Sequence, residues 1–321
     1  MLATAVVAEI ALRVAGNAYL RRLHVQQSTR YTRSPGAINI VALGESSTAG
    51  LWVEPELSYP AQLQRLLREQ HPGREINVIV PPHVGQNTSH MANRIASYLE
   101  LYRPRLVIVM AGTNNEWSLA ESNLGRFLDG DSPERLRVKI ALGLSQLRLY
   151  KVARFGYLKL TAASDSDEQT KLVRKQSRDH YPWGAPEFTP YPPEEWVYSF
   201  ARSNRTAFVA LWRADIDSIL SSTHQFGAAA LLMTYHAPPA YLPLSEWESM
   251  ADRHHVPLVR NDVVFAELLR TESPEEYLLH DGWHPSAKGY AVIARNAHGA
   301  ITELDLLNLS PQTPRDDDAD L

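Results

Sequence analysis

Four short stretches of the sequence combine polar side chains with glycines: GESS at 44–47, PPHVGQNTS at 81–89, AGTNN at 111–115 and DGWHP at 281–285. Together they supply a hydroxyl, an imidazole, a carboxylate, a side-chain amide and glycine backbone N–H groups. Acyl transfer needs this set, because a serine hydroxyl is a weak nucleophile that requires a base within hydrogen-bond reach. A neutral imidazole is such a base when a carboxylate holds its second nitrogen, and fixed donors stabilise the charge that develops on the substrate oxygen.

The spacing of Asp281 and His284 supports this interpretation. Two side chains three residues apart in a turn or in a first helical turn can point the same way. Pro285, directly after the histidine, suits the first position of a following helix. In the second stretch, Gly85 would let the backbone approach a ligand closely. The sequence therefore offers a candidate base with its carboxylate, and candidate donors for an oxyanion.

The elements that must position these residues alternate between strand and helix. Short apolar runs rich in β-branched residues predict strands at 38–43, 76–80, 105–110, 226–235 and 256–261. Helices are predicted at 58–70, at 88–101 with Thr88 or Ser89 as cap, at 204–223, at 244–254 and from Ser286 onward. Such alternation predicts a parallel sheet covered by helices on both faces. Because parallel sheets carry their working residues in loops after the carboxyl ends of strands, we expect the four stretches to meet at one edge.

The four stretches, in this order, resemble the four blocks of the SGNH hydrolases, also called the GDSL esterase/lipase family. Gly44-Glu45-Ser46 resembles the GDS block, Gly85 the glycine of the second block, Gly112-Thr113-Asn114-Asn115 the GxND block, and Asp281-Gly282-Trp283-His284-Pro285 the DxxH block. Each block alone is a weak signal, but all four in order on an alternating α/β pattern are a strong one. The resemblance extends from residue 38 to about residue 300.

The resemblance implies a role for each candidate residue. Ser46 would be the nucleophile, His284 the general base and Asp281 the carboxylate that orients the base. The oxyanion hole would consist of the Ser46 N–H, the Gly85 N–H and the Asn114 side chain. The resemblance also implies a flavodoxin-like three-layer α/β/α sandwich with a five-stranded parallel sheet, and no metal or cofactor.

Two residues depart from the family blocks. Glu45 stands where the GDS block has aspartate, and we expect a local rearrangement of the loop hydrogen bonds there. Asn115 stands where the GxND block has aspartate, which removes a charge beside Asn114 and weakens the support expected for that donor. Neither change affects the three residues expected to form the triad.

The expected reaction is hydrolysis of a carboxylic ester with a short acyl group, and carbohydrate O-acetyl groups are one substrate class by family analogy. Two alternatives remain open. An O-acyltransferase would use the same triad with an acceptor alcohol in place of water, and a non-catalytic carbohydrate-binding relative would have drifted at Glu45 and Asn115. Aromatic residues that could stack on a sugar ring or hold an acyl chain are Trp52, Trp117, Tyr181, Trp183, Tyr191 and Trp196.

Other interpretations of the same residues are weaker. Ser46 could serve only as a helix cap, since serine after a strand is good cap chemistry, and Ser47 is the rival nucleophile. The stretch GESSTAG is not a P-loop, because no lysine follows its second glycine. His236, His254 and His255 show no metal-ligand spacing and are predicted to be surface or core residues.

Composition excludes several function classes. The 321 residues carry a formal net charge of -4, which argues against nucleic-acid binding because such proteins present a basic face. The absence of cysteine excludes disulfides, thiolate nucleophiles and cysteine-ligated zinc. The resemblance to the SGNH hydrolases, and not the composition, implies a small-molecule or glycan ester as the partner, and no nucleic acid is expected.

We expect one hydrolase domain over residues 34–308, with a cap insertion at about 117–203 where the strand–helix rhythm breaks. The basic, leucine-rich stretch 135–160 within it fits a lid helix with a solvated basic face, or a helix on a membrane surface. The acidic tail 309–321 is predicted to be disordered.

The N-terminal segment 1–33 begins with an apolar, alanine-rich run that Glu9 and Arg13 interrupt. No uncharged run reaches the about 18 residues of a membrane span, and the basic start of a signal peptide is missing. We expect a helix that packs on the domain, lies on a membrane surface, or is the remnant of an anchor, with residues 1–24 as the membrane-associated part. The cell envelope is therefore the preferred location and the cytoplasm the alternative.

Overall fold

A five-stranded, all-parallel sheet with strand order β2-β1-β3-β4-β5 lies at the centre of the molecule. The computed structural model describes residues 4, 6–16, 18, 36–81, 86–116, 118–119, 121–130, 132–153 and 195–309. The strands are β1 (Ile38–Gly44), β2 (Ile76–Ile79), β3 (Leu106–Met110), β4 (Ala229–Met233) and β5 (Leu258–Val259). This order is the flavodoxin-like one, so the predicted three-layer α/β fold is confirmed.

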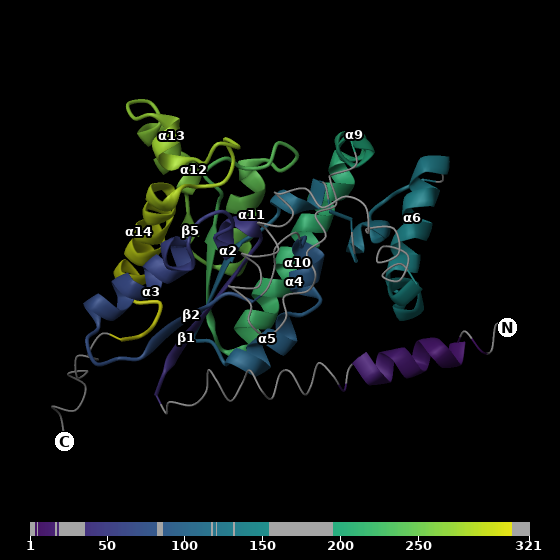
Figure 1. Cartoon of the computed structure of the whole chain (residues 1–321), viewed down its shortest axis with the longest axis horizontal. Helices are drawn as coiled ribbons and strands as arrows, with labels where there is room; N and C mark the ends of the chain where they lie inside the picture. The colour runs from purple at the N-terminus through teal and green to yellow at the C-terminus, as the bar shows by residue number, and fades with distance from the viewer. Residues whose placement is uncertain are drawn as a thin grey trace, which may run out of the picture.

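The central strands β1 and β3 are buried along their whole length. Their sequences, INIVALG and LVIVM, are almost wholly apolar, because successive side chains of a strand enter two different helix layers. Figure 1 shows α3 (Tyr59–Gln70) packed beside α14 (Ala287–Glu303) on one face of the sheet, with α5 (Ile95–Tyr102) and α10 (Arg205–Phe226) on the other. The core therefore consists of two layers, one on each side of the strands.

The remaining elements connect these layers or extend from them. The α-helices are α2 (Ser46–Ala49), α4 (Thr88–Ala92), α6 (Pro133–Ser145), α9 (Glu195–Ser203), α11 (Leu244–His254), α12 (Asn261–Leu268) and α13 (Pro274–Tyr277). Three short 3-10 helices are η1 (Pro55–Leu57), η2 (Thr113–Glu116) and η3 (Asn123–Arg126). Residues 6–16 and 148–153 are also helical.

The five predicted strands are confirmed within a few residues, but the single helix predicted at 88–101 is wrong. The chain forms α4 and α5 there, with Asn93 and Arg94 between them. The predicted cap is also wrong. Asn87 caps α4 by accepting the His90 N–H at 3.2 Å, because the hydroxyls of the two residues after Asn87 donate to a buried carboxylate instead.

Much of the predicted cap insertion lies outside the described residues, as do residues 310–321 of the acidic tail. The insertion and the domain boundaries therefore stay predictions. Among the residues that the structure describes, no helix is both long and apolar enough to cross a lipid bilayer.

The turn after β1 requires glycine at position 44. A Cβ atom there would lie 2.6 Å from the carbonyl oxygen of Met110 and would overlap the Thr48 hydroxyl. Gly44 and Met110 are register partners in neighbouring strands, so the backbone has little room to move away. Packing against the sheet therefore fixes the turn that carries Ser46.

We predict that Gly44→Ala lowers the free energy of unfolding by about 1–3 kcal/mol, because overpacking a rigid site forces the backbone to shift. Urea denaturation measures this change. Gly299→Ala in α14 is the matched control, since no atom lies within 4 Å of its new methyl group. The control should be neutral or stabilising by up to about 1 kcal/mol. Equal stability of Gly44→Ala and the wild type would contradict the packing argument.

Candidate active site

The carboxyl edge of the sheet brings together three residues that are far apart in the sequence. Ser46 is the first residue of α2, directly after β1, and its Oγ lies 2.8 Å from His284 Nε2. The other ring nitrogen, Nδ1, lies 2.5 Å from Asp281 Oδ2. The structure thus connects the hydroxyl, the imidazole and the carboxylate in the order that the sequence predicts, while their catalytic role stays a prediction.

The loop before α14 holds the imidazole in place. Asp281 Oδ1 accepts the backbone N–H groups of Trp283 at 3.0 Å and His284 at 2.9 Å, so one carboxylate shapes the turn and also meets the ring. The Leu279 N–H donates to the His284 carbonyl at 2.8 Å and closes the loop. Burial alone would raise the pKa of Asp281, but the hydrogen bonds from the imidazole and the two N–H groups outweigh it and lower the pKa.

Glu45, the first departure from the family blocks, joins the first strand-end turn to the third. Its side chain is fully buried, and Oε1 accepts the N–H of Gly112 at 2.8 Å and the N–H of Asn114 at 3.4 Å. Burial raises the pKa of Glu45 to about 8 although these hydrogen bonds oppose the rise. The longer side chain therefore reaches across to the loop after β3, which accounts for the rearrangement expected at this position.

The loop after β3 is also fixed from the opposite side. Tyr241 donates its hydroxyl to the Gly112 carbonyl at 2.7 Å, and Trp212 donates its indole N–H to the Ala111 carbonyl at 2.9 Å. Gly112 has a φ of 136°, and a Cβ atom there would lie 2.7 Å from the Trp212 ring. Only glycine fits this combination of backbone angle and close ring contact.

Two of the three expected oxyanion donors lie among the described residues. The Ser46 N–H is at the start of α2, where a helix leaves its first N–H groups without an intrahelical acceptor. Asn114 is buried and donates one hydrogen of Nδ2 to the Gln86 carbonyl at 2.9 Å, and no residue that the structure describes accepts its second hydrogen. Gly85 lies outside the described residues.

Asn115, the second departure, belongs to a buried network that the sequence did not reveal. Its Nδ2 donates to the Thr88 hydroxyl at 2.9 Å, and this hydroxyl donates to Asp215 Oδ2 at 2.7 Å. Ser89 donates to the same carboxylate oxygen at 2.7 Å, and Asn123 donates to Oδ1 at 3.1 Å. The carboxylate of this region thus comes from α10, and position 115 supplies a hydrogen-bond donor.

This network supports α4, and the described contacts of Asn114 come from other residues. Asn114 is held by Glu45 through its backbone and by Gln86 through its side chain. Burial raises the pKa of Asp215, and the hydrogen bonds that it accepts oppose the rise.

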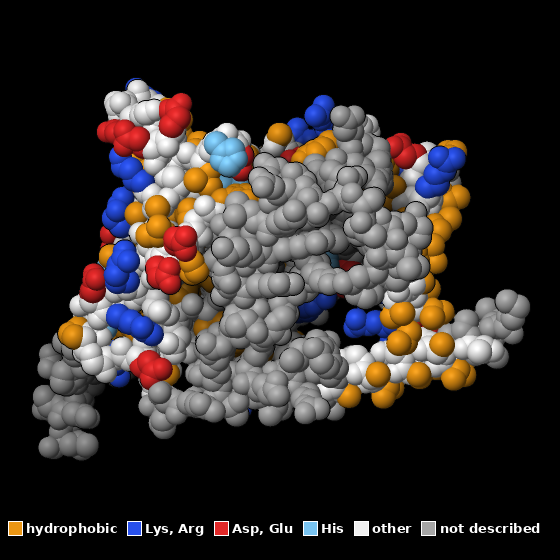
Figure 2. All heavy atoms as spheres, in the orientation of Figure 1, with side chains coloured by type: hydrophobic (Ala, Val, Ile, Leu, Met, Phe, Trp, Pro, Cys, Tyr) orange, Lys and Arg blue, Asp and Glu red, His pale blue; other side chains and the backbone are white. Residues whose placement is uncertain are grey.

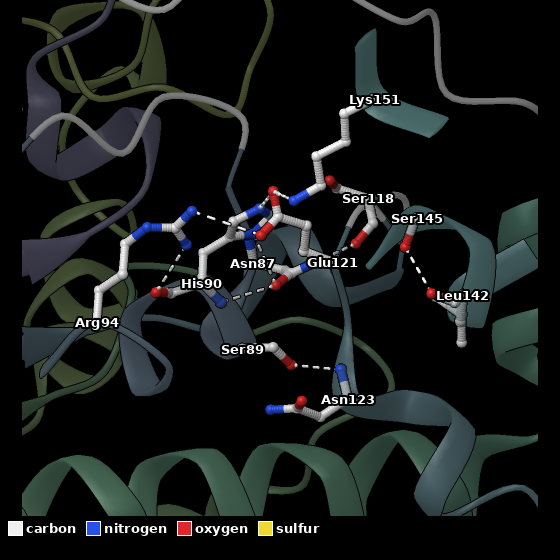
Figure 3. Close-up of polar contacts among 10 residues, drawn as sticks. All are labelled: Asn87, Ser89, His90, Arg94, Ser118, Glu121, Asn123, Leu142, Ser145 and Lys151. Carbon is white, nitrogen blue, oxygen red and sulfur yellow. Dashed lines mark hydrogen bonds and ion pairs between the residues drawn. The ribbon is translucent and has the colours of Figure 1, made fainter. Parts of the chain in front are cut away.

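A cluster of charged residues beside α4 joins the chain around Glu121 to Arg94 and Lys151 (Figure 3). Glu121 lies between Lys151, whose Nζ is 2.7 Å away, and Arg94, whose guanidinium is 3.5 Å away. Asn87 donates to the Ser118 carbonyl at 2.7 Å. Burial lowers the pKa of His90 to about 4, and Arg94 adds to this effect. The cluster therefore ties the helical residues 148–153 to α4.

His236 is a residue near the site that the sequence analysis assigned only to the surface or core. It follows β4 and is buried, and its ring lies 5.5 Å from Trp283 and 5.3 Å from Phe265 between centroids. Burial lowers its pKa to about 4, and the nearby His284 lowers it further. The rule that working residues follow the carboxyl ends of strands could have identified it.

The predictions about aromatic residues near the substrate fall mostly outside the described residues. Of the six aromatic residues expected near the substrate, only Trp52 has a described side chain, and it is partly exposed. Within the described part of the chain, no three histidine, aspartate or glutamate side chains gather in a way that could hold a metal ion.

Comparisons with known proteins agree with the resemblance of the four stretches. A model of the GDSL-like Lipase/Acylhydrolase family matches residues 42–292. Similar solved structures include the esterase EstA from Pseudoalteromonas sp. (14% identity, 83% of this chain and 97% of that chain, TM-score 0.44). Others are an acetyl xylan esterase from Geobacillus stearothermophilus (15%, 85% and 95%, 0.48) and a family 3 carbohydrate esterase from Clostridium thermocellum (15%, 86% and 100%, 0.44). No curated protein sequence matches the chain.

We predict that Glu45 makes the stability of the protein fall as the pH rises. The folded-state pKa is raised from 4.5 to about 8, so the folded state binds more protons than the unfolded state between these values. Glu45 by itself lowers the free energy of unfolding by up to about 1.4 kcal/mol per pH unit over this interval. Below pH 6.5 the buried His90 and His236, whose pKa values are lowered from 6.5 to about 4, oppose this fall, so the effect of Glu45 is clearest between pH 6.5 and about 8. Glu45→Gln keeps the accepting oxygen and removes the titration, so in urea denaturation its free energy of unfolding should lack the fall that the wild type shows between pH 6.5 and about 8.

The exposed Glu303→Gln is the control for this experiment and should leave the slope unchanged. An unaltered slope in Glu45→Gln would mean that Glu45 is ionised in the folded protein.

We predict that Asn115→Asp destabilises the protein by about 2 kcal/mol at pH 7. The new carboxylate would replace the Nδ2 donor of the Thr88 hydroxyl, which already donates to Asp215. Asp215→Asn in the same chain should restore most of the loss, because a donor and one carboxylate are again present. A double-mutant cycle with urea denaturation measures this coupling. Additive effects of the two changes would show that the two side chains do not share a network.

Proposed function

The chain belongs to the GDSL-like lipase/acylhydrolase family and is a carboxylic ester hydrolase, and we propose that Ser46, His284 and Asp281 perform its reaction as a catalytic triad. The observation that carries this proposal is the pair of hydrogen bonds through the His284 ring, 2.8 Å to Ser46 Oγ and 2.5 Å to Asp281 Oδ2. This arrangement gives the hydroxyl a base and gives the base an acceptor for its second nitrogen.

In the acylation step, Ser46 Oγ bonds to the acyl carbon of the ester while His284 Nε2 takes the hydroxyl proton. Asp281 accepts the Nδ1–H, which fixes the tautomer with a free lone pair on Nε2 and stabilises the imidazolium that forms. The imidazolium then gives its proton to the departing alcohol as the bond from the acyl carbon to that oxygen breaks. The acyl group is left on Ser46.

In the deacylation step, the same imidazole takes a proton from water as the water oxygen bonds to the acyl carbon. The bond between the acyl carbon and Ser46 Oγ then breaks, the imidazolium returns the proton to Oγ, and the carboxylic acid leaves. Both steps place negative charge on the carbonyl oxygen of the substrate. The proposed donors to this oxygen are the Ser46 N–H, the Gly85 N–H and the Nδ2 hydrogen of Asn114. The contacts of Glu45 with the loop after β3 support this role, because they hold Asn114 before substrate arrives.

The proposed substrates are esters with short acyl groups, and among them O-acetylated carbohydrates. Both expectations come from the family to which the chain belongs. Hydrolysis of p-nitrophenyl esters of increasing acyl length, followed by acetate release from acetylated oligosaccharides, tests them in turn. Appearance of free acid in the presence of an added alcohol separates hydrolysis from transfer to that alcohol.

We predict that Ser46→Ala lowers kcat/KM for p-nitrophenyl acetate by about 10⁴-fold or more, because the acyl-enzyme can no longer form. Ser47→Ala is the matched control one residue away and should keep kcat/KM within about threefold. Circular dichroism checks that both variants are folded. Retention of more than about a tenth of the activity by Ser46→Ala would overturn the assignment of Ser46 as the nucleophile. A large loss of activity in Ser47→Ala alone would assign the nucleophile to Ser47 instead.

A further inference from the structure

The helix α6 is apolar on two opposite sides. Val138 and Leu142 are buried against the body of the protein. Leu136, Ile140 and Leu144 recur every four residues on the opposite side, and each is between 42% and 55% exposed. Single exposed leucines are ordinary on protein surfaces, but a whole stripe of them on one helix is not explained by the fold.

The helical residues 6–16 also have one side against the protein and another side that is exposed and apolar. Glu9 points toward the protein, where its carboxylate accepts the backbone N–H groups of Arg148 at 3.0 Å and Leu149 at 2.9 Å. The acidic residue that interrupts the apolar run is therefore used to hold this helix beside residues 148–153. The hydrogen bonds from these two N–H groups lower the pKa of Glu9 to about 2. The charge thus persists across the physiological range.

The other side of this N-terminal helix carries an exposed stripe of Val6, Ile10 and Val14, which are 52% to 64% exposed. Figure 2 shows hydrophobic side chains along the outer edges of the N-terminal helix and of α6, at the same end of the molecule. We call these six residues, three from each helix, the apolar end.

Basic residues border the apolar end. At 100° per residue, Arg137 and Lys139 flank the α6 stripe on its two sides, and Glu134 lies about 60° beyond Arg137, farther from the stripe. No acidic side chain in the described part of the chain forms an ion pair with Arg137 or Lys139. Long basic side chains beside an apolar stripe can place their charges at lipid headgroups while the stripe enters the acyl boundary.

We propose that the apolar end binds the surface of an anionic lipid bilayer, with both helices lying in the interface and neither crossing it. A second copy of the chain is a poorer occupant, because a two-fold contact brings the same patch from each copy together. Arg137 and Lys139 would then face a surface without acidic partners. An anionic membrane supplies both the apolar phase and the opposite charge.

Flotation of the full-length protein with vesicles tests this proposal. Vesicles of phosphatidylcholine with about one quarter phosphatidylglycerol should bind the wild type, and binding should weaken as salt is added. The triple variant L136Q/I140Q/L144Q should bind at least about tenfold more weakly, because its apolar stripe is lost. R137Q/K139Q should lower binding to these vesicles and leave any binding to pure phosphatidylcholine unchanged.

A matched control replaces three exposed apolar residues elsewhere, in the triple variant F226Q/V263Q/L304Q, and should bind like the wild type. Hydrolysis of a soluble p-nitrophenyl ester should be the same in all variants, which separates this test from the proposed catalytic role. Vesicle binding that is equal in the wild type and L136Q/I140Q/L144Q, or absent in the wild type, overturns the proposal. A dimer in light scattering that the same variant abolishes, without vesicle binding, would assign the surface to a second copy instead.

Discussion

The hydrogen bond between Ser46 Oγ and His284 Nε2 joins residues 238 positions apart, and the candidate chemistry exists only while this contact is kept. The parallel sheet makes it feasible by bringing strand-end turns to one edge. The finer positioning comes from the helix layer, where Gln62 of α3 donates to the carbonyl of Ala287, the first residue of α14, at 3.1 Å. The same amide donates to the Leu57 carbonyl at 2.7 Å. These two hydrogen bonds tie α3 and Leu57, the last residue of η1, to the start of α14, the helix that follows His284.

Two buried carboxyl groups appear where the chain departs from the family blocks. Glu45 spans from the turn of the nucleophile to the loop of Asn114, and Asp215 supplies from α10 a carboxylate near position 115. Both have a raised pKa because burial penalises their charged forms. A buried carboxylate without hydrogen-bond partners would lower the stability of the fold, so each of the two groups depends on the donors around it. Glu45 and Asn115 thus change which residues hold the loops after the strands, while Ser46 and His284 stay in contact.

Much of this arrangement could be predicted from the sequence, and the remainder could not for definite physical reasons. The apolar runs identify the strands because burial on both faces demands them, and the local spacing of Asp281 and His284 fixes their turn. The break between α4 and α5, the role of Asp215 and the inward direction of Glu9 depend on contacts with residues from distant elements. No local pattern encodes such contacts. His236 differs from these, because its place directly after a predicted strand could have identified it by the rule for parallel sheets.

The most direct test of the account is to find which residue is acylated. The full-length protein is treated with a fluorophosphonate probe, digested, and the modified peptide sequenced by mass spectrometry. The account predicts a single adduct on Ser46, because only this hydroxyl has an imidazole within hydrogen-bond reach in the described part of the chain. An adduct on Ser47 or on another residue, or no adduct on folded protein, would contradict it.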